Sequence, residues 1–272
     1  MDLDEEDRFL MEQLAPAHIA GVHNYCDGWC ERCGFTNRCG IYSMLAREPK
    51  VAGQDSLIEQ LASRFDQVRT HIARRSTFSL EEALKDAEQD IAGESATFAR
   101  DEELRHERRR HDPLLREARA YADLAGAWFE LESDGMRAHA DALVQRAEVD
   151  TVDDISLIEL ARLLDAVAIV RHDCFLIYVK LNRAVDGLEE SKRERWVDDP
   201  VQNDHNGSAK LALTCIDRSE GAWRAIDQWY PGSGGARALA DQLAELRAAV
   251  ERRFQRARAF LRPGFDALMT PD

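Results

Sequence analysis

The chain has 272 residues, of which 44% are hydrophobic and 32% charged, and its 51 acidic and 36 basic side chains give a net charge of −15. This length is sufficient to bury a core without metals or disulfides. The acidity argues against nucleic-acid binding, which rests on a basic surface. Apolar runs of about eighteen residues are absent, so we expect no membrane-spanning helix.

The pattern of apolar residues predicts helices along most of the chain. Asp112 is expected to cap a helix that starts at Pro113, because proline is favoured in the first turn. Ser233 is expected to cap the last helix, after a break at 231–235. The expected helices cover 3–15, 41–45, 56–75, 80–111, 113–131, 135–147, 155–188, 208–229 and 236–261.

The segment 155–188 is the most apolar part of the sequence and is predicted to be the central helix. Its apolar side chains recur mostly at helical spacing and form one predicted buried stripe. The stripe consists of Leu157, Leu160, Leu164, Val167, Cys174, Tyr178 and Leu181. The polar stretch 189–207 that follows is predicted to be the longest loop.

These patterns favour an all-α fold, a bundle of five to seven helices with a small N-terminal cysteine-rich metal-binding cap. We expect residues 1–50 to form the cap and 51–272 to form the bundle, with both in one compact unit. No signal peptide is visible, so a cytoplasmic location with reduced thiols is expected.

Four of the six cysteines lie in one short run, at Cys26, Cys30, Cys33 and Cys39, with spacing C-x3-C-x2-C-x5-C. Thiolates are soft ligands, so four of them in one segment predict a metal centre. Structural zinc usually takes two C-x2-C pairs separated by a longer loop. A single run with unequal gaps favours wrapping around a [4Fe–4S] cluster, with zinc as the alternative.

Two families share parts of this run. The first three cysteines have the spacing of the radical S-adenosylmethionine enzymes, although Arg32 stands where those enzymes carry an aromatic residue. The last three resemble the end of the cluster loop in the endonuclease III family of DNA glycosylases. Both resemblances imply a [4Fe–4S] cluster, and the rest of the chain matches neither enzyme.

The segment Tyr25–Cys33 also resembles a group of bacterial helical proteins that begin with the pattern Y-C-D-x-W-C-E-R-C. The likeness extends weakly to 178–184 and 207–223. This resemblance implies a helical fold and brings no activity with it.

Polar residues interrupt two apolar helices and form a second candidate site. His172 and Asp173 lie in the central helix, where Asp165 shares a face with His172 at a spacing of seven residues. Buried charges are costly unless they are paired, so these residues form either a structural network or a catalytic site. The candidates are His172, Asp173, Lys180, Lys210 and Asp217.

The sequence therefore predicts an iron–sulfur protein that acts in electron transfer or redox sensing, with an unknown redox or protein partner. The first alternative is a zinc-stapled helical module that binds another protein without catalysis. The second is an enzyme whose site is the buried polar network. The sequence does not decide whether the protein is an enzyme.

Overall fold

The computed structural model describes residues 18–46, 103, 105, 107–149, 154–194, 199–232 and 234–266. The chain divides into two compact units, one of Met1–Gly40 with Arg109–Asp272 and one of Ile41–Arg108. The expected boundary at residue 50 and the helices expected at 3–15 and 56–75 lie outside the described residues, as does most of the helix expected at 80–111.

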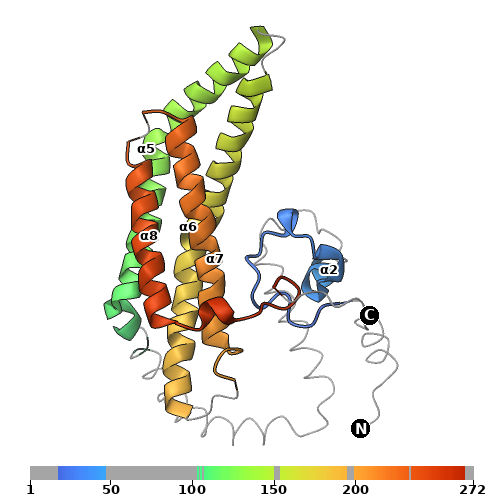
Figure 1. Cartoon of the computed structure of the whole chain (residues 1–272), viewed down its shortest axis with the longest axis vertical. Helices are drawn as coiled ribbons and strands as arrows, with labels where there is room; N and C mark the ends of the chain where they lie inside the picture. Colours follow the sequence, from blue (N-terminus) through green and yellow to red (C-terminus); the bar gives the residue numbers. More distant parts are fainter. Residues whose placement is uncertain are drawn as a thin grey trace, which may run out of the picture. The chain divides into compact units, whose positions relative to one another are not determined.

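The first unit contains a bundle of four long helices, which confirms the all-α prediction (Figure 1). Each helix runs antiparallel to the one before it, and contacts join α5 to α6, α6 to α7, α7 to α8 and α8 to α5. The four helices are α5 (Pro113–Val149), α6 (Asp154–Glu194), α7 (Asp204–Trp229) and α8 (Ala236–Arg253). Among the described residues, no helix is long and apolar enough to cross a membrane.

The start of α5 confirms the sequence prediction. The Asp112 carboxylate accepts hydrogen bonds from the backbone amides of Leu114 and Leu115, at 3.0 and 3.2 Å, and so caps the helix. The helix then continues through Gly135, where a break was expected. The Tyr230 hydroxyl packs against Gly135 and donates to Glu132 at 2.9 Å, so the glycine provides room for a tyrosine.

The other helix ends differ from the expectation in three places. Helix α6 continues to Glu194, because the stretch after 188 consists of good helix formers such as Glu, Lys and Arg. Helix α7 begins at Asp204, with Asn203 accepting from the Asn206 amide, and not at Ser208. Helix α8 begins at Ala236 as expected, after Gly235 with a φ of +92°, but it ends at Arg253 and not at 261. The predicted cap Ser233 lies outside the described residues.

The buried stripe of α6 is shifted by about one residue from the expected one. Leu157 and Leu164 are about half exposed, whereas Leu163 and Val170 are buried. The side chains that face the bundle recur at steps of three and four. They are Leu163, Ala166, Val170, Asp173, Ile177, Leu181 and Ala184. Asp173 therefore occupies a position of the core stripe.

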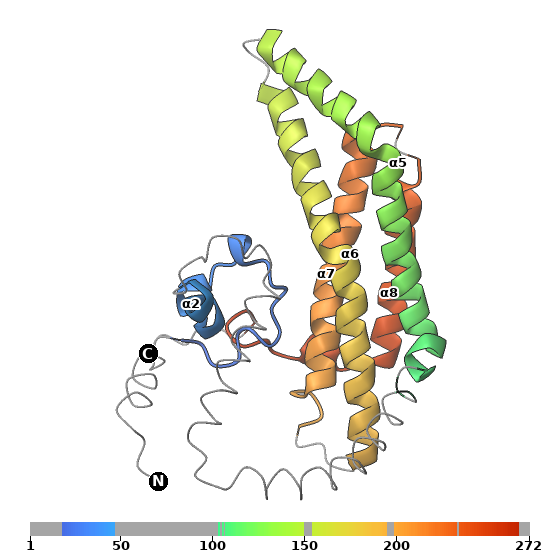
Figure 2. The ribbon, with the colours of Figure 1, turned by 180° about the vertical axis from the view of Figure 1, so that it is seen from behind.

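The centre of the bundle is aromatic. Trp223 of α7 is fully buried and donates its indole N–H to the Tyr121 hydroxyl at 2.9 Å. Its ring contacts Trp128 at 4.9 Å and Phe129 at 5.7 Å between centroids. Seen from behind, α5 and α6 extend past the ends of α7 and α8, where their side chains are more exposed (Figure 2).

Candidate metal centre

The cysteine run forms a loop of tight turns before α2 (Gly40–Ala46). Gly28 has a φ of +77°, and the Asp27 carboxylate accepts from the Trp29 amide at 3.1 Å, as expected for an Asp-Gly turn. Two single 3-10 turns follow, η1 (Cys30–Arg32) and η2 (Thr36–Arg38). A cysteine begins η1, and one follows directly after each turn, so the local backbone spaces the thiols around the loop.

The four thiols belong to one short loop, and three of them act on the pKa of the fourth, Cys30. Burial raises the pKa of Cys30, and the neighbouring Cys26, Cys33 and Cys39 raise it further. Burial also raises the pKa of Cys26. The thiols are not joined in disulfides, and Cys30 is exposed at the surface of the loop. The loop therefore carries four free thiols, three of which lie near enough to Cys30 to affect its pKa.

Two backbone amides point at sulfur atoms of the loop. The Phe35 amide donates to the Cys33 sulfur at 3.4 Å, and the Gly28 amide acts on Cys26 in the direction that lowers its pKa. Hydrogen bonds to sulfur favour the thiolate over the thiol and tune the metal that the thiolate holds. The loop thus supplies the four sulfur atoms and also backbone amides that donate hydrogen bonds to two of them.

The four thiols are not arranged around a single metal ion in this structure. Within the described residues, no three His, Cys, Asp or Glu side chains are placed to hold one metal ion. Four sulfurs on one Zn²⁺, each at about 2.3 Å, would lie about 3.8 Å apart in a tetrahedron. Four thiolates are also the ligands of a four-iron cluster. In its chemistry, the donor set therefore fits either a zinc ion or a cluster.

Trp29 anchors the loop on α6. Its ring stacks on His172 with centroids 4.3 Å apart and an angle of 10° between the planes. The Arg32 guanidinium lies 4.0 Å from the centre of the Trp29 ring and binds Asp165 at 2.6 Å. The predicted shared face of Asp165 and His172 is thus the face that receives the loop.

Arg218 of α7 connects the loop to the interior of the bundle. Its guanidinium donates to the fully buried Asp173 at 2.5 and 2.6 Å and to Asp27 of the loop at 2.7 Å. Asp173 also binds His172 at 2.8 Å and Ser219 at 3.4 Å. Burial tends to raise the pKa of Asp27, but the Trp29 amide and Arg218 outweigh it and hold this pKa below its usual value.

A third anchor holds the opposite side of the loop. The Tyr25 hydroxyl donates to Asp204 at 3.2 Å, and Arg183 binds the same carboxylate. The Tyr25 ring meets Phe260 edge to face at 4.7 Å and fits against Gly207 of α7. A side chain at Gly207 would overlap the Tyr25 ring, so this glycine is required by close packing.

Cationic side chains surround the loop. Burial lowers the pKa of Lys180 on α6, while Cys26 and Asp27 act in the opposite direction. Arg218 is half-buried, and although burial tends to lower its pKa, Asp173 and Asp27 raise it above the usual value. These charges would stabilise thiolates and a negatively charged centre bound by them.

Comparisons of the chain with protein-family models, with curated proteins and with solved structures found no match. The site is therefore interpreted from its own residues.

The predicted polar residues divide into two groups. His172, Asp173 and Lys180 lie on α6 beneath or beside the cysteine loop. Lys210 and Asp217 belong to a separate set of contacts with the C-terminal segment. Lys210 donates to the Arg258 carbonyl at 2.8 Å, and Asp217 binds the Arg258 guanidinium at 2.6 Å.

The sequence interpretation missed Arg218 and Asp27 as the link between loop and bundle. The available signal was Asp173 itself, because a carboxylate in a core stripe requires a cation nearby. Arg218 flanks the buried stripe of α7 that contains Cys215 and Ser219, which makes it a suitable partner.

Proposed function

We propose that Cys26, Cys30, Cys33 and Cys39 hold a [4Fe–4S] cluster and that the protein acts in electron transfer or redox sensing. The observation that carries this proposal is the set of four free thiols that the tight turns of one short loop present. The two amide–sulfur interactions and the nearby Lys180 and Arg218 support it. When bound, such a cluster would supply a centre that accepts and releases one electron.

The residues around the loop would position and insulate the centre. Trp29 stacks on His172 and contacts Arg32, and it would shield part of the loop from water. Arg218 and Lys180 would offset the negative charge of the thiolates. Cys30 is the exposed member of the four, so a redox partner would approach the loop from the side of Cys30.

Serine substitutions test the proposal. Cys30→Ser should lower the iron content of anaerobically purified protein and its broad absorbance near ~400 nm, because one thiolate ligand is lost. Cys174→Ser on α6 is the matched control and should leave both unchanged. Equal iron content in wild type and in the Cys30→Ser and Cys33→Ser variants would contradict the proposal.

The zinc-stapled interaction module is the second candidate. The observation that favours it is the structural use of the loop, whose side chains bind α6 and α7 at three places. In that case purified protein would be colourless and contain one zinc per chain, and the loop would draw together around it.

An enzyme built on the polar network is the remaining alternative. His172, Asp173 and Arg218 bind one another and the loop, which is how a structural network is arranged. If His172→Ala or Asp217→Ala leaves the fold and thermal stability intact, a catalytic use of these residues gains support. If His172→Ala instead destabilises the protein, the network is structural.

A further inference from the structure

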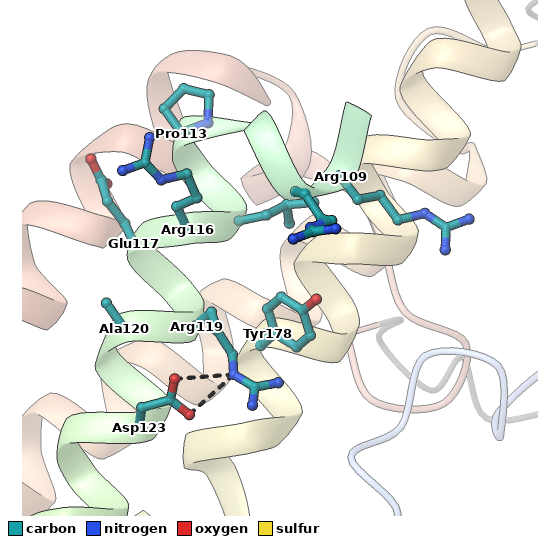
Figure 3. A pocket seen from close by; sticks show the side chains of 10 residues that line it. Arg109, Pro113, Arg116, Glu117, Arg119, Ala120, Asp123 and Tyr178 are labelled. Carbon is teal, nitrogen blue, oxygen red and sulfur yellow. Dashed lines mark hydrogen bonds and ion pairs between the residues drawn. The ribbon is translucent and has the colours of Figure 1, made fainter. Parts of the chain in front are cut away.

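A hollow of 680 Å³ lies on the first turns of α5, and Figure 3 shows the side chains that line it. Its volume falls in the range of small-molecule sites. Most of its lining comes from the segment 109–123, and α6 contributes Tyr178. The lining residues are Arg109, Arg110, Pro113, Leu115, Arg116, Glu117, Arg119, Ala120, Asp123 and Tyr178.

The hollow is cationic in a chain whose net charge is −15. Four arginines line it, against two carboxylates. Two of these arginines are held in place: Arg119 binds Asp123 at 3.0 and 3.2 Å, and Arg109 binds Asp186 at 3.2 Å. Arg110 and Arg116 are exposed and have no ion pair with any described residue. Both arginines are exposed to solvent and line the hollow.

Tyr178 gives the hollow one flat aromatic wall. The Arg119 guanidinium lies 5.7 Å from the centre of the Tyr178 ring, and its pair with Asp123 fixes its orientation. Figure 3 shows Arg119 between Asp123 and Tyr178, with Arg116 on the neighbouring turn of the helix. Guanidiniums bind phosphate oxygens through two parallel N–H donors and are preferred over lysine at such sites.

We propose that this hollow binds a phosphate-bearing small molecule, with Arg110 and Arg116 as the ligands of the phosphate and Tyr178 beside the rest of the molecule. This site is independent of the proposed cluster. The net charge of −15 disfavours binding of a long nucleic acid to the chain. A free phosphate compound and a phospholipid headgroup share the chemistry that the hollow recognises.

Calorimetric titration with pyrophosphate and with ATP tests the proposal. Wild type should bind at least one of them, more weakly as salt is raised. The double variant R110Q/R116Q should bind about tenfold or more weakly, because two charge-assisted hydrogen-bonding groups are lost. Arg137→Gln is the matched control, since Arg137 is an exposed arginine of the same helix outside the hollow, and it should change binding less than about twofold.

Vesicles distinguish the source of the phosphate. The vesicles consist of phosphatidylcholine with phosphatidic acid. If they bind wild type but not R110Q/R116Q, and pyrophosphate competes with them for wild type, the site is assigned to a lipid headgroup. Three results would overturn the proposal. In the first, wild type binds neither pyrophosphate nor ATP nor vesicles. In the second, R110Q/R116Q and R137Q weaken binding equally, and in the third, wild type binds only a DNA or RNA oligonucleotide. Circular dichroism of each variant confirms that it retains its helices.

Discussion

The bundle and the cysteine loop are held by different forces. In the bundle, Trp223, Tyr121 and Leu243 are fully buried, and the helices pack through apolar and aromatic side chains. In the described loop and α2, Val22 is the one buried side chain among residues 18–45. The loop is attached instead by ion pairs, one stacked ring and one hydroxyl.

This contrast indicates that the bundle can fold without a metal, whereas the loop lacks a core of its own. Burial of apolar area is the main source of folding stability, and the loop buries little of it. A bound metal centre would stabilise the folded loop, as the apolar core stabilises the bundle. Variants can therefore separate the stability of the bundle from the attachment of the loop.

Trp223→Ala should have the largest effect and should act on the bundle. The substitution removes a fully buried ring that contacts Trp128 and Phe129, and it removes the indole N–H that donates to the Tyr121 hydroxyl. The expected loss is about 3–5 kcal/mol in the free energy of unfolding, measured by urea titration. A loss below about 1 kcal/mol would contradict the assignment of Trp223 to the core.

Arg218→Ala should affect both regions. It leaves Asp173 buried with only His172 and Ser219 as partners, and it cuts the link to Asp27. The expected loss is about 3 kcal/mol, at the low end for a broken buried pair because Arg218 is partly exposed. The double variant R218M/D173L should recover most of this loss, since no buried charge is left unpaired. Failure to recover would indicate that the Asp27 contact dominates.

Much of the bundle could be predicted from the sequence, because caps and apolar spacing are local signals. Asp112 with Pro113 placed the start of α5, and 231–235 placed the break before α8. The stripe predicted for α6 was right at Leu181, which is buried, and wrong at Leu164, which is exposed while the adjacent Leu163 is buried. Periodicity alone cannot choose which of two adjacent leucines is buried.

The attachment of the loop could not be predicted, because it depends on tertiary contacts between residues far apart in the chain. Asp27 and Arg218 are 191 positions apart, and Trp29 and His172 are also far apart in the chain. The sequence did indicate the residue types that require specific partners, namely the four cysteines and the charged residues of α6. It could not indicate that these two groups lie against each other.

Gly207→Ala should loosen the loop while sparing the bundle. A methyl group there would overlap the Tyr25 ring and would lie 2.8 Å from Phe260. The cost should be about 1–3 kcal/mol, typical of an overpacked site. Limited proteolysis should then cut the loop faster.

Gly221→Ala is the control for this prediction, since Gly221 lies in the same helix with nothing within 4 Å of the new methyl group. It should stabilise the protein slightly, because alanine is the better helix former. Similar proteolysis of both variants would contradict the role given to Gly207.

Asp266→Asn should have the smallest effect and should depend on pH. Burial tends to raise the pKa of Asp266, but its bonds with Arg262 outweigh this and hold the pKa below the usual 3.8. A depressed carboxyl pKa stabilises the folded state above the unfolded value and loses this contribution as the pH falls through the folded one. Wild type should exceed the variant by about 1 kcal/mol at pH 7. The difference should shrink as the pH falls below 3.8, and a constant difference would contradict this account.

The content of iron, zinc and acid-labile sulfide in anaerobically purified wild-type protein tests the central claim most directly. Ligation by Cys26, Cys30, Cys33 and Cys39 predicts iron and sulfide in equal amounts, about four of each per chain, with little zinc. One zinc per chain without sulfide, or no metal at all, would contradict the proposed cluster.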